Sequence, residues 1–384
     1  MRSFRTLFAA IVTLLPITMA FATAQTIAYV GTYTGGKSQG IYAYRVETPA
    51  GGAPHFVPLG LAVATANPSF LAIDAARHLV FAANETDSFN GQPSGAVSAF
   101  SADPATGQLT LLNQQPSHGK APCHLVLDPT GKFLLLANYT SGSVAVYPVA
   151  ADGHLGDATA VIQHRGRGPN AQRQEGPHAH CVTFDPAGRF VFICDLGLDR
   201  VVAYQLDATG KLVAVESAGA TLKPGSGPRH LVFGPDGRFA YVLNELTSTV
   251  TAFSYDAATG RLTEIQTLSS LPAGYTGQKW AAEIAVHPSG KWLYASNRGH
   301  DSVAQFAIDP ATGTLTYGAA QSSGGKTPRN FALLPGGDWL VVANQDSDSL
   351  LVCRVDQVNG RLEPLAGRVE APKPVFVGFL TTGE

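Results

Sequence analysis

The stretch PRHLVFGPDGRFAYVLNELTSTVTAFSYDAATGRLTEIQTL (228–268) decides the fold, because it holds four short apolar runs separated by turn residues. The first run, HLVFG, meets the turn of GPDGR (234–238), and the runs FAYVLN and STVTAFSY follow. A second turn, DAATG (256–260), leads to the last run, LTEIQTL. Aspartate, proline and glycine supply the local hydrogen bonds and positive φ angles of tight hairpins. The stretch therefore predicts four antiparallel strands, which we call A to D.

This pattern recurs along the whole chain. The A run appears seven times, as NPSFLAI (67–73), APCHLVL (121–127), AHCVTF (179–184), PRHLVF (228–233), AAEIAV (281–286), PRNFAL (328–333) and KPVFVGF (373–379). Repeats of about 50 residues made of four short strands indicate a propeller or a solenoid. The pattern starts at a B strand, IAYVGTYT (27–34), and finishes at an A strand, so the two fragments complete one sheet and close a ring without free edges. The sequence predicts an all-β, seven-bladed β-propeller with four antiparallel strands per blade.

The composition narrows the range of partners. The 384 residues carry a net charge of −2, and only 14% of them are charged, which gives no electrostatic basis for binding nucleic acid. Gly (41) and Pro (25) are plentiful, as tight turns require. No CxxC motif or Cys/His cluster has the spacing of a zinc site. We expect small molecules or other proteins as partners, with no metal and no other cofactor.

The N-terminus has the three parts of a secretory signal peptide. Arg2 and Arg5 precede the apolar stretch LFAAIVTLLPITMAFA (7–22), which leads to an Ala-x-Ala site ending at Ala24. We expect cleavage after Ala24, which makes residues 1–24 a signal peptide and residues 25–384 a single propeller domain. Retention as a membrane anchor is the alternative, and Pro16 disfavours it. The mature protein is expected to be a periplasmic or secreted monomer that does not associate with a membrane.

Because export is expected, the four cysteines could meet conditions in which disulfides form. Cys181 and Cys194 flank the turn DPAGR (185–189), and a plausible register places them opposite each other. A disulfide across the two strands is one expectation in an oxidising compartment. The alternative is that these two residues, together with Cys123 and Cys353, are all buried thiols.

Comparing the repeats distinguishes residues that maintain the fold from residues that could act in function. Six B strands end in Asn or Asp, at positions 84, 138, 195, 244, 297 and 344, which favours a structural Asx-type cap of the B–C turn. The position before the A run varies, and includes His180, Arg229 and Arg329. The residue after the B strand also varies, and includes Glu245 and Arg298. D–A lead-ins and B–C turns share one rim of a propeller, so we expect these five residues around one mouth of the channel.

Further polar residues lie close to this mouth in the predicted arrangement. Glu283, His230 and Gln345 occupy neighbouring positions of the repeat. A long D–A connection (164–178) carries Glu175 and His178, and long rim loops often carry function. Arginine binds carboxylate or phosphate in a bidentate manner, so an anionic ligand is expected. The alternative is a buried polar network that plugs the channel.

An ordered set of motifs resembles a known family. GPNAQRQEGPHAH (168–180), DLGLDRV (195–201), GPRHLVF (227–233), NEL (244–246), WAAEI (280–284), SNRG (296–299) and TPRNF (327–331) are similar to the lactonase family of seven-bladed propellers. The family includes propeller-type 6-phosphogluconolactonase and is related to carboxy-cis,cis-muconate cyclase. The resemblance implies active-site roles for His180, Arg229, Glu245, which follows Arg229 by sixteen residues, and Arg298. Arg329, Glu283, His178, His230 and Gln345 are expected to bind substrate. The phosphorylated lactone is a cytosolic metabolite, whereas export is expected here, so the resemblance leaves the substrate's phosphorylation open.

These residues support a hydrolase hypothesis. The arginines would hold an anionic group and stabilise the oxyanion formed when water attacks a sugar-derived lactone. Glu245 or His180 would accept a proton from the water, and the other would protonate the ring oxygen. A lactonizing cycloisomerase acting on a muconate-type acid and a non-catalytic binding propeller remain as alternatives. A calcium-dependent lactonase is disfavoured, because a rim dominated by arginine repels a hard cation.

Overall fold

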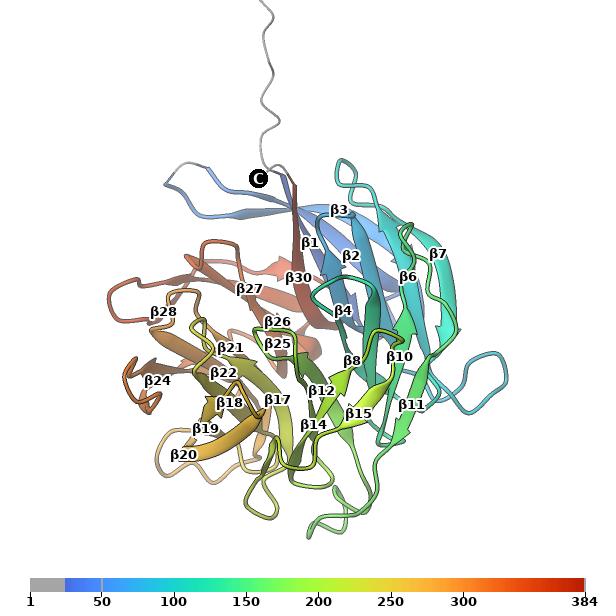
Figure 1. The fold of residues 1–384 in the computed structure, drawn as a ribbon. Helices are drawn as coiled ribbons and strands as arrows, with labels where there is room; N and C mark the ends of the chain where they lie inside the picture. The colour runs from blue at the N-terminus through green and yellow to red at the C-terminus, as the bar shows by residue number, and fades with distance from the viewer. Residues whose placement is uncertain (1–24, 50, 383–384) are drawn as a thin grey trace, which may run out of the picture.

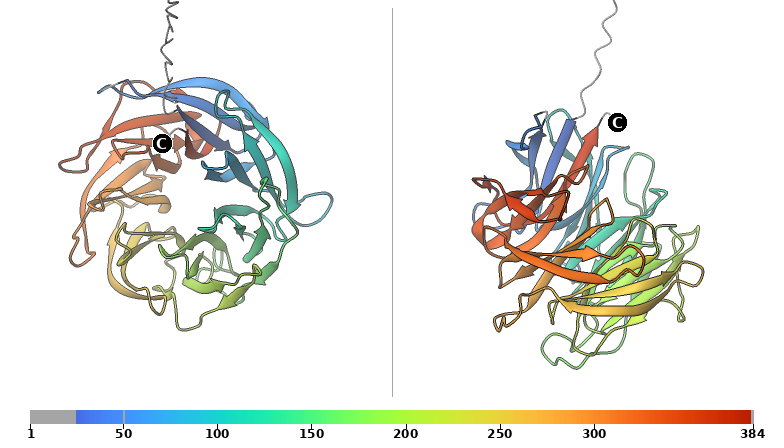
Figure 2. Two further views of the ribbon diagram at one scale, coloured as in Figure 1. Left: turned by 45° about the horizontal axis from the view of Figure 1, so that its top comes forward. Right: turned by 90° about the vertical axis from the view of Figure 1, so that its left-hand side faces the viewer.

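The computed structural model describes residues 25–49 and 51–382 as seven antiparallel β-sheets arranged around a central axis (Figures 1 and 2). We number the sheets as blades in the order in which they follow one another around the ring. Blade 1 comprises β30 (Pro374–Thr382), β1 (Gln25–Thr32), β2 (Gly40–Glu47) and β3 (His55–Ala64), and blade 2 comprises β4 (Pro68–Asp74), β5 (Leu79–Asn84), β6 (Ala96–Ala102) and β7 (Leu109–Pro116). Blade 3 comprises β8 (Pro122–Leu127), β9 (Phe133–Asn138), β10 (Ser143–Pro148) and β11 (Ala160–Gln163). Blade 4 comprises β12 (Ala179–Phe184), β13 (Val191–Asp195), β14 (Arg200–Leu206), β15 (Leu212–Ala214) and β16 (Ala220–Thr221).

The remaining three blades follow the same plan. Blades 5 to 7 comprise β17 (Pro228–Phe233), β18 (Phe239–Asn244), β19 (Thr249–Asp256) and β20 (Arg261–Ser269); β21 (Trp280–Val286), β22 (Trp292–Arg298), β23 (Ser302–Ile308) and β24 (Leu315–Ser322); and β25 (Pro328–Leu333), β26 (Trp339–Asn344), β27 (Ser349–Val355), β28 (Leu362–Pro364) and β29 (Val369–Glu370). A single 3₁₀ turn, η1 (Gln345–Ser347), interrupts the strands of the described chain. The outermost strand is split in two in blades 4 and 7. The predicted all-β propeller with seven four-stranded blades is confirmed.

The ring closes through the innermost strands. β30, β4, β8, β12, β17, β21 and β25 each contact the innermost strands of both neighbouring blades, and β25 contacts β30. Blade 1 is composite, because β30 pairs with β1 from Gln25↔Thr382 to Thr32↔Pro374. Figure 1 shows the two ends of the described chain side by side in this blade. The predicted closure by the two terminal fragments is therefore confirmed.

Apolar packing occurs between blades. Seven clusters of buried hydrophobic residues fill the seven blade–blade interfaces, and each cluster takes residues from two adjacent blades. Strand C of each blade alternates between the two interfaces: in blade 5, Val250 and Ala252 pack toward blade 6, whereas Phe253 packs toward blade 4. Burial of both faces explains why these strands are nearly continuous apolar runs.

The recurring Asn and Asp residues do more than cap a turn, which corrects our expectation. The side-chain amides of Asn138, Asn297 and Asn344 donate to the backbone carbonyls of Ser117, Ser270 and Ser323, each of which directly follows the outermost strand of the preceding blade. Asn84 makes the same bond to Ala66. These residues are fully or almost fully buried, so a bond replaces water at the blade junction. We call this recurring contact the inter-blade clamp.

Candidate functional site

A β-bulge in every innermost strand presents the variable position to the channel mouth. In each blade strand A has one residue more than the facing part of strand B, and the residues of strand A left out of the pairing are Val375, Ser69, Cys123, His180, Arg229, the pair Ala282–Glu283, and Arg329. A bulge leaves its extra residue outside the ladder and re-aims its side chain, and bulges are common beside active sites. The residues that differ between repeats are thus the residues that the backbone releases from pairing.

The B–C turns lie against the D–A lead-ins, as predicted. The backbone N–H of Glu245 donates to Gly227, that of Leu196 to His178, and that of Gln345 to Thr327. We call the rim formed by these turns and lead-ins the near rim. It carries Glu245 and Arg298 beside the bulged residues. The predicted grouping of polar residues on one rim is therefore observed.

Glu245 is the centre of an arginine cluster. Its Oε1 accepts a hydrogen bond of 2.6 Å from Arg173 Nη2, and its Oε2 lies 2.9 Å from Arg298 Nη2 and 3.1 Å from Arg229 Nε. The Arg229 Nε–H is not directed at the oxygen and has no hydrogen-bond partner, so this contact is an ion pair only. Arg229 Nη1 donates to the carbonyl of Ala282. Three guanidinium groups therefore surround one buried carboxylate.

The cluster fixes the charge of Glu245. Burial acts to raise its pKa, but the charges of Arg298, Arg229 and Arg173 outweigh burial and lower the pKa to about 2. Burial lowers the pKa of Arg298 to about 10, so this guanidinium still carries its charge at neutral pH. A carboxylate with such a low pKa is a weak proton acceptor. Glu245 is better suited to hold the three arginines in place.

His180, unlike Glu245, is uncharged at neutral pH. Burial, together with the charges of Arg229, His230 and Arg329, lowers the pKa of His180 well below 6.5. Its ring lies 5.5 Å from the Tyr139 ring and 5.4 Å from the His230 ring, and its Nδ1 is 3.8 Å from Cys123 Sγ. A neutral imidazole at neutral pH has a free lone pair with which to accept a proton.

His230 and Glu283 form a separate network below the mouth. His230 Nδ1 lies 2.8 Å from Glu283 Oε1, and its Nε2 lies 3.1 Å from Arg229 Nη1. Glu283 Oε2 accepts a 2.5 Å hydrogen bond from Asn330, whose own carbonyl oxygen accepts from the Val377 backbone N–H. All of these side chains are buried. The polar atoms of His230 and Glu283 link blades 5, 6, 7 and 1, and the expected binding of substrate by these two residues stays a prediction.

Arg298, Arg329 and Gln345 meet at a depression in the near rim with a volume of about 360 Å³. Tyr33, Trp280, Lys326, Asp301 and Asp346 also line it. Arg329 lies over the Tyr33 ring, 5.2 Å from its centroid, and 3.8 Å from Glu85 Oε2, to which Tyr33 donates a hydrogen bond. Arg298 belongs both to this depression and to the Glu245 cluster.

The long connection between β11 and β12 reaches over the site. His178 is buried, stacks on Tyr139 at 4.5 Å, and has its Nδ1 3.0 Å from the Tyr139 carbonyl and its Nε2 3.2 Å from Glu175. Arg173 from the same connection donates to Tyr139 Oη and to Glu245. Sequence comparison missed Arg173, since this connection has no counterpart in other repeats against which it could be contrasted.

The cysteines follow the second of the two expectations. Cys181 and Cys194 face each other across β12 and β13, yet all four cysteines are free and buried. The signal-peptide prediction falls on residues 1–24, which lie outside the described residues. Within the described part of the chain, no helix has the length and apolar character needed to cross a membrane.

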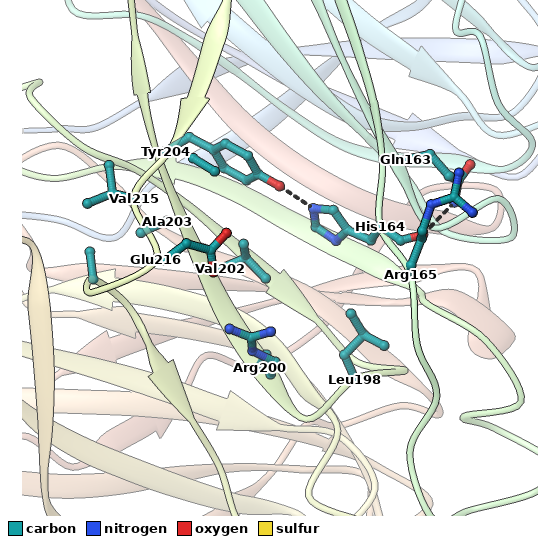
Figure 3. Close-up of a pocket in the computed structure, with 12 residues that line it drawn as sticks. Gln163, His164, Arg165, Leu198, Arg200, Val202, Ala203, Tyr204, Val215 and Glu216 are labelled. Carbon is teal, nitrogen blue, oxygen red and sulfur yellow. Dashed lines mark hydrogen bonds between the residues drawn. The ribbon is translucent and has the colours of Figure 1, made fainter.

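A second cavity lies at the split outer strand of blade 4 (Figure 3). Its wall includes Tyr204, whose hydroxyl lies 3.1 Å from His164 Nε2, and His164 Nδ1 lies 2.6 Å from Asp195 Oδ2. Asp195 and His164 occupy the positions at which other blades form the inter-blade clamp. This variant of the clamp holds two adjacent blades with ionisable side chains.

The match to a protein family agrees with this geometry. The family model described as "Lactonase, 7-bladed beta-propeller" matches residues 27–379. The chain belongs to this family. The predicted family and the predicted enzyme class, a lactone hydrolase, are confirmed.

Named relatives cover nearly the whole chain. The 6-phosphogluconolactonase of Bacillus subtilis is 37% identical over 92% of this chain and 98% of its own length. The 6-phosphogluconolactonase of Formosa agariphila is 32% identical over 75% of this chain and 80% of its own. The solved structure of the periplasmic gluconolactonase PpgL of Pseudomonas aeruginosa superposes with a TM-score of 0.85 at 36% identity, covering 93% of this chain and 99% of that one.

Proposed function

We propose that this lactonase hydrolyses a sugar-derived lactone at the near rim, with His180 as the proton-transfer group. The observation that carries the proposal is a neutral, buried imidazole beside an arginine cluster whose only central carboxylate is held ionised. The geometry suits a reaction in which negative charge develops on a carbonyl oxygen, because positive groups fixed in advance stabilise that charge most effectively.

The proposed reaction proceeds in two steps. His180 accepts a proton from a water molecule as the water oxygen attacks the lactone carbonyl carbon, and Arg298 and Arg229 stabilise the oxyanion. The C–O bond to the ring oxygen then breaks, and His180 returns the proton to that oxygen. Burial lowers the pKa of His180, which favours this return of the proton. Glu245 acts as a positioning residue that fixes the three arginines.

No metal is assigned a part in this reaction. Among residues 25–49 and 51–382, no group of three or more His, Cys, Asp or Glu side chains is arranged to hold a metal ion. Hydrolysis should therefore continue at full rate in a chelator. Loss of activity in the chelator would contradict this part of the proposal.

The test is hydrolysis of D-glucono-δ-lactone, measured above the spontaneous rate, with the 6-phosphorylated lactone and a muconate-type acid in parallel. Arg298→Ala and His180→Asn should each lower kcat/KM about a hundredfold. Arg354→Ala, which removes an exposed arginine that pairs with Glu363, is the control and should not change the rate. Wild-type rates in both site variants would refute the assignment.

We also infer that the protein is exported and acts as a monomer. The basic and apolar N-terminal segment supports export, and so does the periplasmic location stated for the P. aeruginosa relative. Fractionation of cells that express the full chain should recover a product that starts at Gln25. Size-exclusion chromatography with light scattering should give the mass of one chain.

A further inference from the structure

Trp280 is an exposed aromatic residue beside the proposed reaction centre. Within the described residues, the large apolar side chains that face solvent are Leu111, Val161, Val213, Trp280 and Val358. The other four lie on outermost strands or in a peripheral turn, whereas Trp280 begins an innermost strand and is 40% exposed. An exposed apolar surface within a polar pocket commonly marks a binding site. Trp280 therefore requires a functional explanation that the other four do not.

The indole is held in a defined position. Trp280 pairs with Arg298 across β21 and β22, and Arg298 Nε donates to the Trp280 carbonyl over 3.4 Å. The Arg298 guanidinium carbon lies 6.0 Å from the centroid of the indole ring. Arg298, which links the depression to the Glu245 cluster, thus also positions the indole of Trp280.

Hydrogen bonds fix Thr327 in the wall of the depression. Its φ of 58° belongs to the repeated D–A lead-in, because Asn67, Ala121 and Lys373 also have positive φ angles before the proline that begins strand A. The Thr327 backbone N–H donates to Asp301 Oδ1 over 2.8 Å, and its hydroxyl donates to Asp346 Oδ2 over 2.5 Å. These two bonds hold the carboxylates of Asp301 and Asp346 in the wall.

The charges in the depression are mixed. Arg298, Arg329 and Lys326 supply donors, while Asp301 and Asp346 supply carboxylate acceptors. A ligand that matches this lining needs an apolar face for the Trp280 indole and polar groups that both donate and accept hydrogen bonds. A pyranose ring satisfies both requirements, because its C–H face is apolar and its edge carries hydroxyls that donate as well as accept.

We propose that this depression is a carbohydrate subsite in which the Trp280 indole stacks on the face of a pyranose ring. The proposal rests on the proposed function, and it specifies which part of the molecule recognises the sugar. Arg298 and Lys326 bind the ring's acidic or hydroxyl substituents, and Asp301 accepts hydrogen bonds from its hydroxyls. The carbonyl to be attacked then lies toward Arg298, which the subsite shares with the reaction centre.

Two measurements test the subsite. D-glucuronate, a pyranose with a carboxylate but no lactone, should produce a saturable change in tryptophan fluorescence, and acetate at the same ionic strength should not. The change should disappear in Trp280→Phe, although Trp292 and Trp339 remain. With D-glucono-δ-lactone, Trp280→Ala should raise KM about tenfold while kcat changes less than about twofold. Trp280→Phe should recover most of the affinity, and Leu111→Ala, which truncates another exposed apolar residue, should have no effect.

The outcomes separate this inference from the proposed function. An unchanged KM in Trp280→Ala, a fluorescence response that survives Trp280→Phe, or an equal response to acetate would overturn the subsite. A wild-type protein that shows the Trp280-dependent response to glucuronate but hydrolyses no sugar lactone would refute the proposed function and leave the subsite standing.

Discussion

Replacing Glu245 with glutamine should remove about 3 kcal/mol of stability at neutral pH. The arginine cluster lowers the pKa of Glu245 from 4.5 to about 2, and each pKa unit corresponds to about 1.4 kcal/mol. Because the pKa is depressed in the folded protein, the contribution is fully present above pH 4.5 and is lost as the pH falls toward 2. Glutamine keeps the volume of the side chain and, like the protonated acid, leaves three guanidinium charges without a counter-ion, so the loss should be about 3 kcal/mol.

The assay is urea unfolding of the wild type and of Glu245→Gln at pH 7 and at several lower pH values. The variant should unfold at lower urea at pH 7, and its stability should depend less on pH between 4.5 and 2. Glu363→Gln is the matched control, since Glu363 pairs with Arg354 at 2.6 Å while both side chains are about half exposed. An exposed pair contributes about 0–1 kcal/mol. Equal unfolding midpoints for the two variants at pH 7 would refute the reasoning.

Three further predictions use the same contacts. If His180 accepts the proton, kcat/KM should stay level as the pH falls to 6.5 and decline only below that pH, because burial keeps the pKa of His180 lower than 6.5. A pH–rate profile in which the decline is centred above pH 7 would contradict this role. Asp195→Asn should cost about 1–2 kcal/mol in urea unfolding, since it replaces the charge-assisted bond to His164 with a neutral one, and an unchanged midpoint would contradict the clamp. The native protein should have no thiol that reacts with a thiol reagent and the denatured protein four, whereas a count of two would show that Cys181 and Cys194 had formed a disulfide.

The repeat comparison located most of the candidate site, because residues that maintain the fold recur in every blade of a propeller, whereas residues available for chemistry differ between blades. His180, Arg229 and Arg329 fall in one column of the alignment, and that column is the bulge of each innermost strand. The column was visible in the sequence. The bulge was not, because it depends on how strands A and B pair.

The errors have a common cause, which is that they concern contacts between blades. The clamp asparagines recur at the ends of B strands, so a local turn cap was the natural hypothesis, whereas their amides bind the preceding blade. Arg173 lies in a connection without repeats, and its contact with Glu245 spans 72 positions. The contact between His230 and Glu283 also joins adjacent blades and could not be read from the repeats, while their expected role in substrate binding stays a prediction. A single chain compared with itself carries no information on such pairings.

The pairing of β1 with β30 has a consequence for folding. β1 gains its inner neighbour only after β30 has been made, so the ring cannot close before these residues have been synthesised. Until then the first three strands lack the innermost strand of their sheet and one of the two blade interfaces they finally share. The earlier strands therefore wait in an open ring, with one unpaired sheet edge, for a segment about 350 positions away in the chain.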